Sequence, residues 1–171
     1  MSSSDPVPTT LVGPERFRYS LRQVPAAVSV VLTRSAAGAI RGVTCTSATS
    51  VSADPPMALV CVGARTGVAD LVREDGWFSI NVLAADRSAI ARAFTVGGNA
   101  IDPDAVRVGP GRSGVPVLIT GTVCVLECQL AAVHPGGDHW VLHGTVRHAR
   151  FQADVHPLCY CRGTYGRFVP D

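Results

Sequence analysis

The stretch "GVTCTSATSVSADPPMALV", residues 42–60, decides the fold class because it alternates in a β-strand pattern and then meets two prolines. One face of the predicted strand carries Val43, Cys45, Ser47, Thr49 and Val51. The other face carries Thr44, Thr46, Ala48, Ser50 and Ser52. A row of hydroxyl groups can hold a flat ligand with mixed polar edges, and an exposed edge strand rich in threonine shows the same pattern. The pattern alone leaves both interpretations open.

Outward from this stretch, the chain alternates strands with short helices. Alternating apolar runs predict strands over residues 26–34, 57–63, 76–84, 115–133, 139–152 and near 157–163. Helical spacing predicts helices over 15–24, 66–75 and 86–95, the last with Asp86 as its N-cap. Residues 96–114 are rich in Gly, Pro and Asp and predict a long loop of the kind that forms lids. Residues 1–13 predict a flexible segment ahead of one domain over 14–171.

Composition excludes several classes of function. Hydrophobic residues make up 47% of the 171 residues and charged ones 16%, which favours an oligomer that hides apolar surface. The net charge is +2 and the arginines are scattered, so we expect no nucleic-acid partner. The start of the chain resembles no signal sequence and no apolar run is long enough for a membrane span, so we expect a cytoplasmic protein.

The six cysteines predict reduced thiols rather than a disulfide framework or a metal site. Cys124 and Cys128 are the pair that spacing singles out. On a strand, four residues separate them by about 13 Å, which is too far for two thiolates to share one zinc ion. Small buried apolar side chains explain them better, and no metal is expected.

Two glycine-containing stretches suggest phosphate binding. "GPGRSG", residues 109–114, matches GxGxxG, but the strand-like "VPV" follows it where a nucleotide-binding turn needs a helix, so we expect no Rossmann domain. "GARTGVADL", residues 63–71, places Arg65 and Thr66 at the start of a predicted helix, an arrangement that suits a phosphate. An ordinary threonine N-cap beside a solvated arginine explains that pattern too, since such caps are common.

Five blocks, in order and spacing, resemble the flavin reductase family of two-component monooxygenase systems. They are "GVTCTSATSVSADPPMALV", "WFSINVLAADRSAIARAF", "VCVLECQL", "GGDHWVLHGTV" and "PLCYCRGTYGRF". The resemblance covers about residues 15–168. It implies a mainly β fold, a β-barrel with peripheral helices of the FMN-binding split β-barrel, Greek-key type. It also implies a homodimer that binds FMN or FAD between subunits, reduces it with NADH or NADPH, and supplies reduced flavin to a partner monooxygenase.

The resemblance also implies roles for particular residues. The implied flavin contacts on the opening stretch are Thr44, Cys45, Thr46, Ser47, Ala48, Thr49, Ser50 and Ser52. Arg65 and Thr66 are implied phosphate contacts, Asn81 is implied to border the same pocket, and His139 is implied to lie near the nicotinamide. A histidine after Gly-Gly-Asp is otherwise an ordinary turn residue. Ala48 and the segment "NAIDPDAVRV", residues 99–108, depart from the family pattern, and both departures bear on cofactor specificity.

Hydride transfer between two bound cofactors needs stacking rather than a nucleophile or an acid–base triad, and the chain offers no such triad. Two other functions remain as alternatives. One is a flavin carrier or sensor without turnover, and the other is a flavoprotein reductase that acts on its own small substrate.

Overall fold

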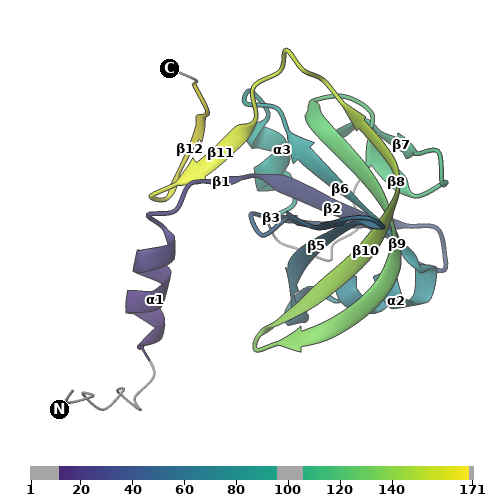
Figure 1. Ribbon diagram of the computed structural model, residues 1–171, viewed down its shortest axis with the longest axis horizontal. Coiled ribbons are helices and arrows are strands. Elements are labelled where there is room, and N and C mark those ends of the chain that lie inside the picture. Colours follow the sequence, from purple (N-terminus) through teal and green to yellow (C-terminus); the bar gives the residue numbers. More distant parts are fainter. Residues whose placement is uncertain (1–11, 96–105, 170–171) are drawn as a thin grey trace.

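The computed structural model describes residues 12–95 and 106–169, which form three antiparallel sheets and a few short helices (Figure 1). The seven-stranded sheet contains β2 (Ser29–Arg34), β3 (Ile40–Cys45), β4 (Thr49–Ala53), β5 (Pro56–Gly63), β6 (Trp77–Leu83), β9 (Thr122–Gly136) and β10 (His139–Phe151). The smaller sheets contain β1 (Ala26–Ala27), β11 (Leu158–Cys161) and β12 (Thr164–Arg167), and β7 (Val108–Pro110) with β8 (Pro116–Leu118). The helices are α1 (Pro14–Leu21), η1 (Ala64–Thr66, a 3-10 turn), α2 (Val68–Asp75) and α3 (Ser88–Ala93).

The large sheet curls into an open barrel. Its strand order is β3-β2-β6-β9-β10-β5-β4, so the two edge strands, β3 and β4, follow one another in the chain. Consecutive strands that lie far apart in a sheet are typical of Greek-key connections. Within the described residues no backbone ladder joins β3 to β4, so the barrel is split rather than closed. The predicted mainly β class is confirmed.

Two apolar cores lie on opposite faces of β2. Val31 points into the barrel, where alternate residues of β5 such as Val60 and Val62 pack with Phe78 and against α2. The neighbouring residues of β2 point outward into a second core, formed with Phe94 after α3 and with residues of β8 and β11. Because both faces of β2 are covered, the first five residues of its run "SVVLTR" are all buried.

Helix α1 stands apart from the barrel. It begins at Pro14, whose missing N–H suits the first turn, and none of its side chains is buried. Figure 1 shows it projecting from the same side of the molecule as β1, β11 and β12. Phe17 and Leu21 are 54% and 56% exposed, so the apolar side of this helix is not packed against the rest of the chain.

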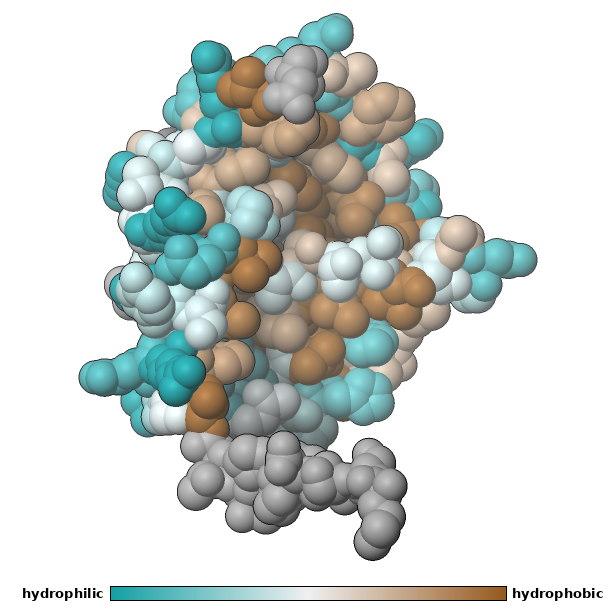
Figure 2. Space-filling model, turned by 60° about the vertical axis from the view of Figure 1, so that its left-hand side comes forward, coloured by the Kyte–Doolittle hydropathy of each residue, from teal (hydrophilic) through white to brown (hydrophobic). Residues whose placement is uncertain are grey.

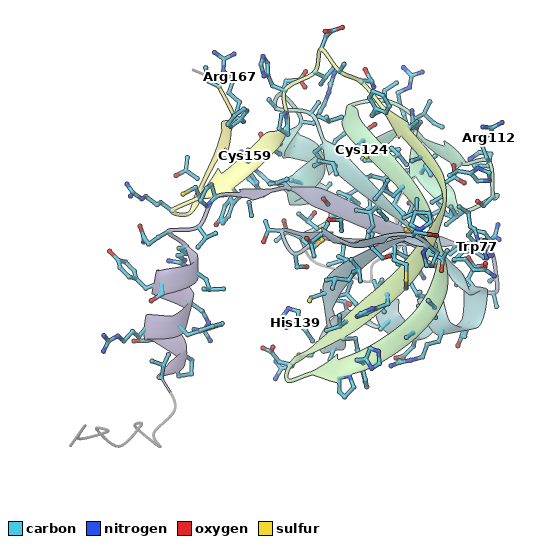
Figure 3. All side chains as sticks on the ribbon, viewed as in Figure 1. Trp77, Arg112, Cys124, His139, Cys159 and Arg167 are labelled. Carbon is cyan, nitrogen blue, oxygen red and sulfur yellow. The ribbon has the colours of Figure 1, made fainter. Side chains whose placement is uncertain are left out.

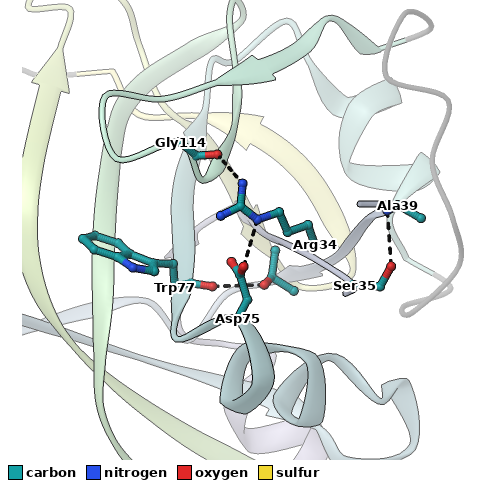
Figure 4. A network of polar contacts seen from close by, with 7 residues as sticks. Arg34, Ser35, Ala39, Asp75, Trp77 and Gly114 are labelled. Carbon is teal, nitrogen blue, oxygen red and sulfur yellow. Dashed lines mark hydrogen bonds and ion pairs between the residues drawn. The ribbon is translucent and has the colours of Figure 1, made fainter. Parts of the chain in front are cut away.

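A polar network joins the end of β2 to the end of α2 and the start of β6 (Figure 4). Arg34, at the end of β2, forms an ion pair of 2.8 Å with Asp75 and donates a second hydrogen bond to the carbonyl oxygen of Gly114. The Thr33 hydroxyl donates to the carbonyl oxygen of Trp77 at the start of β6. Figure 3 places Trp77 and His139 on opposite sides of the barrel, so this network supports the fold away from the predicted site.

Three sequence predictions need correction. The strand predicted over 115–133 is divided into β8 and β9 by a turn in which Gly121 has a φ of +76°, a value that favours glycine. Asp86 does not cap α3, because Arg87 occupies the N-cap position and Asp86 forms an ion pair with it. The predicted loop contains β7 near its end, and residues 96–105 of it lie outside the described part of the chain.

The "GPGRSG" turn binds an internal carboxylate instead of a nucleotide. Glu127 on β9 is 6% exposed, and its two carboxylate oxygens accept the backbone N–H groups of Arg112 at 2.9 Å and Ser113 at 2.7 Å. A Cβ at Gly111 would lie 2.5 Å from that carboxyl group, so a larger residue there would displace the carboxylate from its position in the turn. A strand, β8, follows the turn, and the expectation of no Rossmann turn at this motif is confirmed.

Candidate cofactor-binding site

The opening stretch is not one strand, because the chain crosses between the sheet edges at residues 46–48. Ser47 anchors this crossing: its hydroxyl donates to the carbonyl oxygen of Cys61 at 3.1 Å and accepts the N–H of Cys61 at 2.9 Å. One side chain thereby links the crossing that follows β3 to the backbone of β5. The predicted faces therefore do not continue across residues 46–48, and the single-strand prediction is wrong.

The hydroxyl groups of this stretch have different environments. Thr44 donates to the carbonyl oxygen of Ala91 at 2.7 Å, which ties β3 to α3. Thr46 is exposed at the crossing and lines two neighbouring cavities. Thr49, Ser50 and Ser52 lie on edge strand β4, far along the sheet order from Thr44. Thr46 and Ser47 are therefore the two residues of this set that line the cavity between α1 and the sheets described below.

Cys45 and Ala48 contribute packing. Both are half-buried and lie against the core inside the barrel. Burial raises the pKa of the Cys45 thiol to about 11, against smaller opposing effects of its hydrogen bonds with Ser47. The Cys45 side chain is consequently a protonated thiol at neutral pH and not a nucleophile.

The turn between β5 and α2 carries the predicted phosphate contacts. Thr66 donates to the carbonyl oxygen of Gly63 at 2.7 Å and accepts the N–H of Val68 at 3.3 Å. Gly67, with a φ of +69°, takes the N-cap position that the sequence suggested for Thr66. Arg65 is exposed, and its guanidinium makes no hydrogen bond or ion pair with the described residues. The turn thus offers an unneutralised cation beside the start of a helix.

His139 lies next to this turn. It opens β10 directly opposite Gly63, and the carbonyl oxygen of the preceding Asp138 accepts the N–H of Ala64 at 2.9 Å. The ring Nδ1 of His139 lies 2.6 Å from Asp138 Oδ1. That hydrogen bond, followed by the charges of His139 and Arg18, holds the pKa of Asp138 below its ordinary value. The predicted histidine and the predicted phosphate turn therefore lie side by side.

Asn81 lies elsewhere. It is fully buried in β6, where its side-chain amide donates to the carbonyl oxygen of Val30 and to Ser79, and accepts the N–H of Leu118. These bonds fasten β8 over the second core and use the polar capacity that a ligand would need. We do not retain Asn81 in the candidate site.

A cavity of about 460 Å³ lies between α1 and the sheets, beside the crossing. Its apolar lining comes from Phe17, Leu21, Val24, Ala26 and Tyr160. Its polar lining comes from Thr46, Ser47, Arg18 and Arg22. Figure 2 shows hydrophobic residues gathered along a hollow on the side that carries α1, and Figure 3 shows His139 on the side of the β9–β10 hairpin that faces this helix.

Sequence reasoning missed the contributions of α1 and β11 to this cavity. The signal was present in the helix, where Arg18 and Arg22 are four residues apart and therefore share a side next to the Phe17–Leu21 stripe. The signal for Tyr160 was absent, because only the pairing of β11 with β1 brings it there.

The cysteines form no pair, and all six have free thiols. No cluster of three or more His, Cys, Asp or Glu side chains suited to a metal ion occurs in residues 12–95 and 106–169. Across the same residues, no helix is both long and apolar enough to cross a membrane.

The mainly β fold is that of the flavin reductases, as comparison with known proteins shows. The model of the flavin reductase like domain matches residues 21–168, so the chain belongs to the flavin reductase family. An NADH-dependent flavin reductase of Rhodococcus is 35% identical over 156 residues, which are 90% of this chain and 86% of the relative. An FMN reductase (NADH) of Agrobacterium fabrum, SmoA, is 37% identical over 89% of this chain and 84% of its own.

Solved structures show the same relationship. The NADH:FAD oxidoreductase SgcE6 of Streptomyces globisporus superimposes with a TM-score of 0.84 at 31% identity, covering 96% of this chain and all of its own. A second structure of that protein contains NAD and FAD fragments, with a TM-score of 0.83 and coverage of 95% and 99%.

Proposed function

We propose that this protein is an NAD(P)H:flavin oxidoreductase, a cytoplasmic homodimer that reduces FMN or FAD and supplies reduced flavin to a partner monooxygenase. The observation that supports the proposal is that His139 and the Arg65–Thr66 turn lie side by side at the end of β5. The Ser47 hydroxyl binds the backbone of Cys61, two residues before that end, and Thr46 and Ser47 line an open cavity. Its volume lies within the range of small-molecule sites, and its lining combines apolar walls with a few polar groups. Relatives named as reductase components of 4-hydroxyphenylacetate 3-monooxygenase and resorcinol hydroxylase support the partner.

The residues present fit two stacked cofactors. The nicotinamide supplies the hydride and the flavin ring accepts it, so the protein's task is to hold the two rings in contact. Thr46 and the backbone of the crossing offer hydrogen bonds to a polar ring edge, and Arg65 offers a cation to a phosphate. His139 lies at the end of β5 and β10, where it can orient the second ring.

Uncovered apolar surface supports the proposed homodimer. Phe17 and Leu21 of α1 and Val24 beyond its end are more than half exposed, and Phe168 and Val169 after β12 are also exposed. Such a surface on one side of a small protein is typical of an interface. Light scattering during size-exclusion chromatography would give twice the mass of the chain, and a monomer at all concentrations would contradict the dimer.

Steady-state NADH oxidation with and without added FMN or FAD tests the function. We expect saturable dependence on added flavin. No oxidation under any condition would favour the carrier or sensor and would overturn the proposal. Flavin that co-purifies and turns over only with another acceptor would favour a reductase with its own substrate.

The role of His139 has a separate test. In His139→Ala we expect turnover to fall by roughly ten-fold or more while the flavin dissociation constant changes little, because the histidine orients the second ring. His148→Ala, on the same strand, is the control. Unaltered NADH kinetics in His139→Ala would leave this histidine as a turn residue.

A further inference from the structure

A pair of histidines lies on the β9–β10 hairpin, outside the set of residues assigned to the cofactors. The rings of His134 on β9 and His143 on β10 lie edge to face, with their centroids 5.2 Å apart and their planes at 79°. His134 is exposed and His143 is half-buried. Whereas the ring of His139 hydrogen-bonds Asp138, neither ring of the pair makes a hydrogen bond or an ion pair with the described residues. The ring nitrogens of the pair therefore remain available to a ligand.

The register of the hairpin fixes where the two rings lie. His134 is paired with Val141, and His143 is two residues further along β10. Side chains two residues apart on a strand point to the same face, so His134 and His143 are diagonal neighbours on one face of the hairpin. Leu142, between Val141 and His143, is fully buried in the core inside the barrel. The two rings therefore lie on the outer face of the sheet, turned away from that core.

The distance between the rings suits two ligands of one metal ion. Imidazole nitrogens bind a divalent transition metal at about 2.0–2.1 Å, and at a tetrahedral angle two such rings have their centroids about 5 Å apart. The observed separation of 5.2 Å agrees with this value. The second side-chain torsion of histidine is a broad rotor, so each ring turns a nitrogen toward a shared ion without leaving a rotamer well. Because the backbone ladder between β9 and β10 holds both anchors in place, the pair is already arranged for chelation.

We propose that His134 and His143 bind one divalent transition-metal ion of the class that prefers imidazole ligands, such as Ni²⁺ or Zn²⁺, and that the ion links β9 to β10. Residues 12–95 and 106–169 contain no cluster of three or more metal-ligating side chains, so water completes the coordination of this ion. Neither histidine lines the cavity beside α1 or belongs to the apolar surface that supports the proposed homodimer. The bound ion stabilises the hairpin that carries His139 at its tip.

The test uses His134→Gln and His143→Gln, with His156→Gln as a matched control, because His156 is an exposed histidine outside the hairpin. Calorimetric titration of the full chain, prepared without a histidine tag, uses Ni²⁺ alone. Imidazole suits Ni²⁺, whereas the six free thiols favour softer ions. We expect one ion per chain in the wild type and in His156→Gln. Binding should be about 100-fold weaker in each hairpin variant, because the remaining imidazole loses the high effective concentration of the other.

Amide hydrogen exchange provides a second measurement. Ni²⁺ should slow the exchange of the β9 and β10 amides near the pair in the wild type and in His156→Gln, but not in His143→Gln. Wild-type affinity in either hairpin variant would overturn the proposal. So would a wild type that binds no ion, since the two rings would then make only an edge-to-face contact. Neither measurement needs flavin or nicotinamide, so the outcome is independent of the proposed function.

Discussion

The turn at residues 109–114 and the turn at residues 63–67 each combine glycines, an arginine and a hydroxyl residue, yet the fold uses them in opposite ways. In the first, the backbone N–H groups of Arg112 and Ser113 are taken by the buried carboxylate of Glu127. In the second, Arg65 keeps its charge exposed beside the start of α2, with His139 next to it. A glycine-containing turn is therefore an anion site for a ligand only where the protein has not supplied the anion itself.

The largest expected effect concerns the turn at residues 109–114, whose backbone N–H groups are bound by Glu127. Glu127→Ala removes the acceptor of two buried N–H groups, so the free energy of unfolding should fall by about 3 kcal/mol. Glu74→Ala, an exposed residue of α2, should change it by less than about 0.5 kcal/mol. Chemical denaturation measures both. Equal losses in the two variants would mean that the turn is not held by its internal carboxylate.

The turn at residues 63–67, where Arg65 is exposed, gives the next largest effect, on flavin affinity. In Arg65→Ala we expect about ten-fold weaker FMN binding, since a charged contact to the phosphate is lost. Arg112→Ala removes the same side chain from the turn at residues 109–114 and should leave the affinity unchanged. Flavin fluorescence quenching gives both dissociation constants. An unchanged value in Arg65→Ala would remove this arginine from the site and end the contrast between the turns.

The smallest effect is a dependence of stability on pH. Burial raises the pKa of Glu127, but the N–H groups of Ser113 and Arg112, with the charge of His148, outweigh it and hold the pKa below the ordinary 4.5. The carboxylate therefore stabilises the fold fully above pH 4.5, and this contribution is lost as the pH falls through the lower folded-state value.

Unfolding of the wild type and of Glu127→Gln at a series of pH values measures this dependence. The difference in stability between the two should be constant near neutrality and shrink below pH 4.5. A difference that persists or grows in acid would show that it does not come from the charge of the Glu127 carboxylate.

Much of the fold could be predicted because the signals that specify its elements are local. Alternation predicted the strands that became β2, β5, β6 and β10, and Pro14 with the Phe17–Leu21 spacing predicted α1. The errors fall where a distant contact decides. Ser47 interrupts the predicted strand because its hydroxyl binds the backbone of Cys61, and Asp86 loses the cap position to Arg87.

The candidate site was less predictable, since a polar side chain binds a ligand only if the fold has left it free. The sequence suggested Thr44 and Asn81 as ligand contacts. In the structure the Thr44 hydroxyl donates to the carbonyl oxygen of Ala91, and the Asn81 side chain accepts the N–H of Leu118. His139 and Arg65 are far apart in the chain and meet only because β10 pairs with β5. The four-residue spacing of Arg18 and Arg22 is visible in the sequence, but only the fold shows that they line the cavity.

The amino-acid sequence by itself determined the family, the mainly β class and most strand positions, because period-two alternation and ordered motifs depend on residues a few places apart. Only the tertiary structure decided which of two similar turns stays open and which helix forms a wall of the cavity. The physical reason is that each donor can be satisfied once, and the partner that satisfies it, such as Glu127 for the "GPGRSG" turn, arrives from another strand.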